Sequence, residues 1–175
     1  MYGDIISGMK IKTLFIVILI CLSVLFCSCE KETVPAEMPA DFDFIIVYQH
    51  AFIVDTYKDT LTETDLYNGD VIYDVRFDFT DEQMENIYSE FVKRNLHKIE
   101  DGTDVGPIRS VPPVGVYFTY TSGGKTLSIN CSDVHLPKVG GKEKLNFVEF
   151  TDFIIAYIVD SEQYQDAPHI FYGWE

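Results

Sequence analysis

Three residues whose types and spacing could support chemistry lie close together near the end of a predicted strand. Cys131, Asp133 and His135 alternate in sequence, so an extended chain would place a thiol, a carboxylate and an imidazole on one face. Such a set could form the corner of a metal site or a nucleophilic Cys–His pair. The same alternation groups Cys131 with Leu127 and Ile129, and free cysteines are usually small buried apolar residues. We therefore predict a core position for Cys131 without a catalytic or metal-binding role.

A second candidate is the acidic segment between residues 55 and 70. Calcium prefers oxygen ligands, and glycoside hydrolases use paired carboxylates. The segment lacks the spacing of an EF-hand loop, and acids are so frequent in the chain that a pair could be chosen almost anywhere. Scattered acids on a solvated loop are the simpler interpretation, so we predict no metal, no cofactor and no catalytic residue here. The acids concerned are Asp55, Asp59, Glu63, Asp65 and Asp70.

No nucleotide-binding, serine-hydrolase or zinc-protease motif occurs in the sequence. His50 and His97 stand alone within predicted elements. The aromatic C-terminal tail could stack on a sugar or dock a protein, although packing against the core explains it at least as well. The tail residues concerned are His169, Phe171, Tyr172 and Trp174.

The N-terminal segment has the layout of a secretory signal. Lys10 and Lys12 precede the apolar run 14–26, which is shorter than the roughly 20 residues that a membrane span needs. The small Ser28 then stands directly before Cys29. This resembles the lipobox of bacterial lipoproteins. The resemblance implies that Cys29 is acylated, for example with palmitate, and becomes the first residue of the mature protein.

The residues around Cys29 define the predicted domain boundaries. Phe26 stands where a lipobox usually has leucine, and the alternatives to lipidation are an uncleaved anchor or a plain secretory signal. The acidic stretch that follows resembles the surface-export signal of Bacteroidota-type lipoproteins, with a solvated linker as the alternative. We predict a signal peptide over residues 1–28, an acidic tether over 29–41 and one globular domain over 42–175.

The chain is strongly acidic, with a formal net charge of −15. Cleavage after residue 28 would remove one acid and two bases and make the charge −16. This charge argues against nucleic-acid binding, which needs clustered lysine and arginine, and suits solubility, cations or a basic protein partner. Only Cys29 and Cys131 would remain after cleavage, so we expect a fold that rests on its core without an internal disulfide.

Apolar periodicity locates the strands. Residues 42–54 are dense in β-formers, and residues 71–79 alternate as in a strand with one wet face. Residues 114–131 predict a hairpin that turns at two glycines. Segments 55–70 and 100–113 are polar and rich in turn residues, so we predict loops there.

Two helices complete the predicted fold. Thr80 and Gln83 form a capping box ahead of a helix of about 14 residues that ends near Asn95. Asn146 could cap a second helix, with Glu149 as its partner. The order ββα–ββα predicts a two-layer α+β sandwich, an antiparallel sheet of four to five strands with both helices on one face.

The combination of lipobox, acidic tether and one α+β domain resembles small uncharacterised lipoproteins of Bacteroidota-type bacteria. The segment TDEQMENIYSEF (80–91) also resembles a recurrent element of such domains of unknown function. The resemblance implies an outer-membrane location, possible surface exposure and membrane attachment through the N-terminal lipid, and it carries no catalytic residue. We expect a non-catalytic module that binds an envelope protein or a glycan through its sheet face or tail. The alternatives are an inhibitor or immunity-type lipoprotein, an envelope hydrolase using loop carboxylates, or a structural component.

Overall fold

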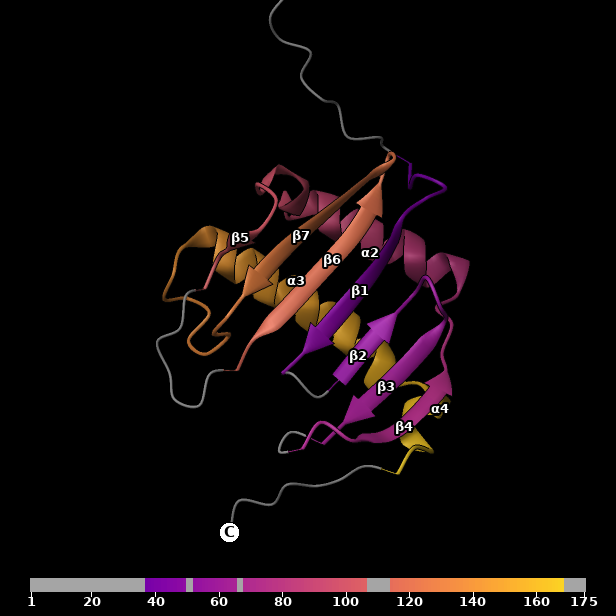
Figure 1. Ribbon diagram of the computed structural model, residues 1–175. Coiled ribbons are helices and arrows are strands. Elements are labelled where there is room, and N and C mark those ends of the chain that lie inside the picture. Colours follow the sequence, from indigo (N-terminus) through magenta and orange to yellow (C-terminus); the bar gives the residue numbers. More distant parts are fainter. Residues whose placement is uncertain (1–36, 50–51, 66–67, 107–113, 169–175) are drawn as a thin grey trace, which may run out of the picture. The chain divides into compact units, whose positions relative to one another are not determined.

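Alternating apolar residues along the strands give the sheet one buried face. The computed structural model describes residues 37–49, 52–65, 68–106 and 114–168, all of which belong to the unit Pro35–Glu175. The seven-stranded mixed sheet has the order β4-β3-β2-β1-β6-β7-β5 (Figure 1). The elements are β1 (Asp43–Tyr48), β2 (Phe52–Asp55), β3 (Thr60–Thr64), β4 (Val71–Arg76), α2 (Asp81–Lys93), the 3-10 helix η1 (Leu96–Lys98), β5 (Thr103–Asp104), β6 (Val116–Ser122), β7 (Lys125–Cys131), α3 (Lys142–Val159) and α4 (Glu162–Gln165).

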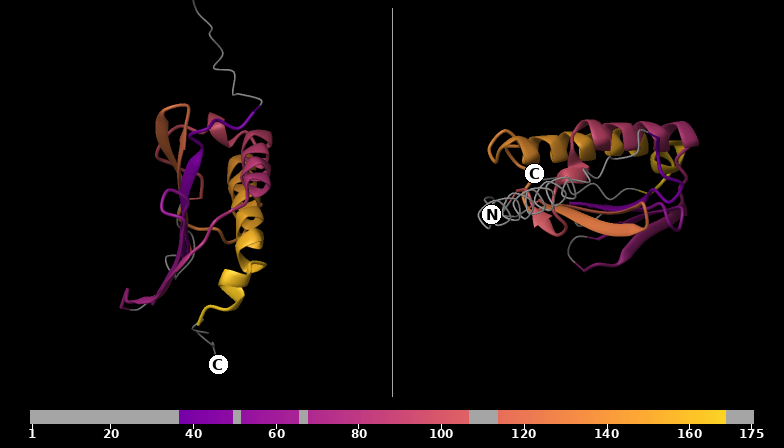
Figure 2. Two further views of the ribbon diagram at one scale, coloured as in Figure 1. Left: turned by 90° about the vertical axis from the view of Figure 1, so that its right-hand side faces the viewer. Right: turned by 90° about the horizontal axis from the view of Figure 1, so that it is seen from above.

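The sheet is built outward in both directions from β1. Strands β1 to β4 form an antiparallel meander, and β6 pairs with the other edge of β1. The β6–β7 hairpin continues the sheet, and β5 adds a two-residue parallel pairing beyond β7. Helices α2 and α3 lie side by side on one face of this sheet (Figure 2).

Aromatic side chains join the helix layer to the sheet. Phe91 of α2 and Phe150 of α3 both contact Phe118 of β6, with ring centroids 6.2 Å and 5.1 Å away. Phe44 of β1 contacts the same ring at 5.4 Å. All four rings are almost fully buried. Because aromatic rings bury large apolar areas, this cluster is the centre of the core.

The start of α2 confirms the predicted capping box. The Thr80 hydroxyl accepts a hydrogen bond from the Gln83 amide at 3.2 Å, and the Gln83 side chain accepts from the Thr80 amide at 2.8 Å. The helix ends at Lys93, close to the predicted end, and Asn95 follows with φ +60°. Asparagine is one of the few residues that tolerate this left-handed conformation.

The α+β class, the two layers and the placement of both helices on one face are confirmed. The predicted strand count is wrong, and the predicted order matches only in part, since β6, β7 and α3 follow it whereas four strands precede α2. The sheet has seven strands rather than four or five, and β5 makes it mixed. The extra strand β3 lies within the segment 55–70, where a loop was predicted. Its threonines are β-branched and favour a strand, while the acids beside it serve the preceding turn. The short β5 likewise falls within the predicted loop 100–113.

The second helix begins earlier than predicted. Helix α3 starts at Lys142 after Gly141, so Asn146 lies inside the helix and does not cap it. The Asn146 side-chain amide instead donates to the Arg94 carbonyl at 2.9 Å, which ties α3 to the end of α2. Arg94 also forms ion pairs with Glu90 and Glu149, so polar contacts join the outer sides of both helices.

The capping box gives a direct test of the local folding argument. Replacing Thr80 with alanine removes the acceptor for the Gln83 amide, so the free energy of unfolding should fall by about 1 kcal/mol. Chemical denaturation followed by circular dichroism measures this change. Ser89→Ala, on an exposed position in the middle of the same helix, is the matched control and should leave stability nearly unchanged. Equal effects of both substitutions would contradict the capping role.

Candidate functional site

Cys131 occupies the predicted core position at the end of β7. Its side chain is fully buried, and the thiol donates to the Asp133 carbonyl at 3.3 Å. Asp133 is 1% exposed, and its carboxylate accepts from the His135 amide at 2.9 Å. The His135 side chain is exposed, because the strand has already ended at Cys131. The three residues therefore do not share a strand face, and burial raises the pKa of the Cys131 thiol.

Lys144 is the residue near Cys131 that the sequence analysis missed. It is 2% exposed, and its ammonium donates to the His135 carbonyl at 2.8 Å. Its burial could have been inferred from its helical spacing, because Lys144 lies on the same face of α3 as the buried residues Phe147, Val148 and Thr151. The hydrogen bond attaches the loop after β7 to the first turn of α3, which is a structural role.

The acids of the segment 55–70 do not converge on one point. Asp55 is 5% exposed, accepts from the Tyr57 amide and pairs with Lys58 at 2.8 Å, so it organises the turn before β3. Asp59 ends that turn with φ +54°. Asp65 accepts from the Asn68 amide in the next turn. Glu63 faces the helix side of the sheet, opposite Phe52 of β2 and Tyr73 of β4.

Carboxylates elsewhere in the loops also bind backbone amides. Asp41 accepts from the amides of Gly123 and Gly124, and these hydrogen bonds lower the pKa of its carboxyl group. Asp101 accepts from the Ser128 amide at 2.7 Å, and Asp104 accepts from two further amides. These side chains satisfy amides that the turns and strand ends would otherwise leave without partners.

No arrangement for metal binding is found in the part of the chain that the structure describes. There, no group of three or more His, Cys, Asp or Glu side chains could hold an ion. His97 packs against Phe91 at a ring distance of 6.3 Å, and burial lowers its pKa, which favours the neutral imidazole. Cys29, His50 and the aromatic tail from His169 onward lie outside the described residues.

The sheet face opposite the helices is the most extensive candidate surface. We call it the open face, because no described helix packs on it (Figure 2). Its centre is apolar and half-buried, and hydroxyl and amide side chains flank it on both sides. The central residues are Ile45, Val47, Ile53 and Tyr117. The flanking residues are Thr60, Thr62, Thr119, Thr121, Thr126, Ser128 and Asn130.

Strand register aligns these side chains into rows across the open face. Ile45 pairs with Thr119 of β6, and Val47 pairs with both Ile53 and Tyr117. The hydroxyl groups are partly linked to one another, since Thr121 contacts the Tyr57 hydroxyl at 2.6 Å and the Thr126 hydroxyl at 2.8 Å. A surface with such short, linked side chains is preorganised for contact and loses little entropy on binding.

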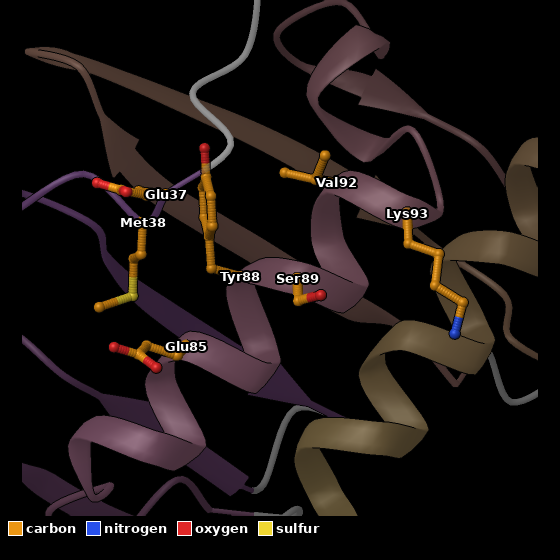
Figure 3. Close-up of a pocket in the computed structure, with 7 residues that line it drawn as sticks. All are labelled: Glu37, Met38, Glu85, Tyr88, Ser89, Val92 and Lys93. Carbon is orange, nitrogen blue, oxygen red and sulfur yellow. The ribbon is translucent and has the colours of Figure 1, made fainter.

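A cleft of about 690 Å³ lies between residues 37–38 and one side of α2 (Figure 3). Glu37, Met38 and Glu85 gather at one end of the cleft, whereas Lys93 lies at the other end. The Lys93 ammonium is engaged by Glu90 at 2.5 Å. No set of catalytic groups converges in this cleft, so its geometry does not indicate a reaction.

Comparisons with known proteins assign no class to this chain. No protein-family model matches it, and a search of curated proteins finds no significant relative. No described helix has the length and apolar character needed to cross a membrane.

The buried thiol yields a chemical prediction. A protein beginning at residue 30 contains Cys131 as its single cysteine. Because the thiol is buried and its pKa is raised, native protein at pH 8 should resist alkylation by iodoacetamide and react fully only in denaturant. Mass spectrometry of timed samples measures this difference. Ser89→Cys, which adds an exposed thiol on α2, should react under native conditions at that site alone. Rapid modification of native Cys131 would overturn its assignment to the core.

Proposed function

We propose that this protein is a lipid-anchored, non-catalytic binding module of the bacterial cell envelope that holds a partner protein against the open face of its sheet. The observation that carries the proposal is the contrast between the two sheet faces. One face is covered by α2 and α3, whereas the other presents an ordered apolar centre without a covering helix among the described elements.

The composition of the open face favours a protein partner. An apolar centre with a polar rim is the usual anatomy of a protein interface, and tyrosine is enriched in such centres. Tyr117 lies in the row that contains Val47 and Ile53, with Asn130 on its other side. A glycan would use the same hydroxyl groups and the tyrosine ring, but the aliphatic side chains of Ile45 and Ile53 add little to sugar binding.

The net charge indicates what kind of protein would bind. At −15, the chain attracts a basic partner over several ångströms and speeds its association. Asp43 and Asp74 add negative charge at the borders of the open face. An inhibitor or immunity-type lipoprotein that neutralises a basic toxin or enzyme is a particular case of this proposal.

The proposed location follows from the N-terminal sequence. Acylation of Cys29 would anchor the domain to the outer membrane, and the tether to residue 41 would let the open face meet partners away from the bilayer surface. Several acyl chains on one cysteine hold a protein stably, whereas one chain holds it only marginally.

The hydrolase alternative receives less support from the loop carboxylates. Asp55, Asp101 and Asp104 accept hydrogen bonds from backbone amides of their own loops or of neighbouring strands. A carboxylate that holds a turn in this way is constrained by the fold and is poorly placed to act as a general acid or base. Binding without turnover is therefore the simpler function for these loops.

The proposal can be tested by placing one arginine on either side of the domain. Thr119→Arg puts a long cation on the open face, next to the central residue Ile45, and Ser89→Arg adds the same charge on α2. A pull-down from detergent-solubilised envelope, with protein beginning at residue 30 as bait, should recover a stoichiometric partner with wild type and Ser89→Arg. Thr119→Arg should reduce its recovery by at least about tenfold, because the arginine adds bulk and like charge.

Salt provides the second part of this test. Binding to a basic partner should weaken as the salt in the washes is raised, because screening shortens the reach of surface charges. Equal recovery with both variants would reject the open face as the binding surface. A glycan recovered in place of a protein would reject the proposed partner class.

A further inference from the structure

A second candidate site lies on the helix side of the sheet, near the C-terminal end of α3. The register of β1 to β4 places Tyr48, Phe52, Glu63 and Tyr73 in one transverse row at this end of the sheet. Side chains directly opposite each other on neighbouring strands lie close enough to interact. Tyr164 of α4 closes the row from the other layer, with its ring 5.6 Å from that of Phe52 at an angle of 78°.

These residues enclose a cleft of about 310 Å³. This volume is at the lower end of the range for small-molecule sites. Its walls combine aromatic rings, aliphatic side chains of α3, one carboxylate and one amide. The lining residues are Tyr48, Gln49, Phe52, Glu63, Ile155, Val159 and Tyr164.

The electrostatic character of the cleft is negative. Glu63 supplies a carboxylate that interacts with the Tyr73 hydroxyl, and none of the lining residues that the structure describes is basic. Burial raises the pKa of Tyr73, and the nearby charge of Glu63 raises it further. Burial also raises the pKa of Tyr48, and the charge of Asp152 raises it further. The pKa of Tyr164 is raised in the same way, by burial and then by the charge of Glu63. The phenols therefore stay neutral at physiological pH, and their rings keep electron-rich faces.

We propose that this cleft binds a small organic cation, namely an alkylated ammonium group. Aromatic faces attract cations through the ring quadrupole, and the attraction grows when the cation is desolvated. Phe52, Tyr48 and Tyr164 supply the rings, and Glu63 supplies the counter-charge. The methyl groups of such a cation would contact Ile155 and Val159, which gives the cleft a reason to prefer it over a hydrated metal ion.

This site is independent of the proposed function. Strand alternation directs Glu63 and Phe52 to the helix side, whereas Thr62 and Ile53 beside them point to the open face. A partner protein on the open face would leave the cleft uncovered. Failure of one proposal therefore leaves the other standing.

Choline and its neutral carbon isostere 3,3-dimethylbutan-1-ol distinguish charge recognition from simple apolar packing. Titration calorimetry on protein beginning at residue 30 should show choline binding about tenfold more tightly than the isostere. In two-dimensional NMR spectra, choline should shift the methyl signals of Ile155 and Val159 while leaving those of Val148, in the first half of α3, unchanged. Equal affinities for the two compounds, no binding of either, or shifts at a different site would each overturn the proposal.

The charge of Glu63 is tested by an isosteric change. Glu63→Gln should weaken choline binding about tenfold and leave the affinity for the neutral isostere unchanged. Glu143→Gln, an exposed change in the first turn of α3, is the matched control and should bind choline like wild type. Phe52→Leu removes one ring without altering charge and should weaken choline more than the isostere. Unchanged choline binding in a folded Glu63→Gln protein would overturn the role of this carboxylate.

Discussion

The contact between Phe91 of α2 and Phe118 of β6 is the interaction on which the rest of the structure depends. It joins the helix layer to the middle of the sheet, and Phe150 of α3 reaches the same ring from the neighbouring helix. Because both helices use one sheet face, the strands direct their most deeply buried residues, such as Phe44, Val54 and Phe118, to that side. The core therefore fixes the side on which each strand residue lies, including residues far from the aromatic cluster.

This one-sided packing has two consequences for function. The residues that alternate with the buried ones along each strand, such as Val47 and Ile53, point away from the helices and form the open face. Phe52 and Glu63 point to the helix side but lie near the strand ends, beyond the aromatic cluster around Phe118. Helix α4 covers them there only in part. A shift of one residue in register would exchange these two sets and destroy both surfaces, so core packing and candidate binding sites are set by the same constraint.

Much of the fold could be predicted from the sequence, because helix caps and strand alternation are set by residues close together in the chain. The capping box at Thr80 and the core position of Cys131 depend on neighbouring residues, and both were identified. Strand β3 was missed, since its threonines are polar and became recognisable as a strand only when paired between β2 and β4. The row containing Glu63 could not be found either, because it joins four strands whose registers follow from tertiary pairing rather than from sequence spacing.

The acidic side chains show why residue counts are a poor guide to chemistry in this chain. The acids near turns are engaged by nearby amides, as Asp41 is by Gly123 and Gly124, and there they set loop geometry. Glu63 differs because it is half-buried beside Phe52 and Tyr73 on the helix side of the sheet, where its charge acts on the neighbouring phenol. The same charge lines the adjacent cleft, where it would attract a cation. The surroundings of one carboxylate therefore carry more functional information than the excess of acids over the whole chain.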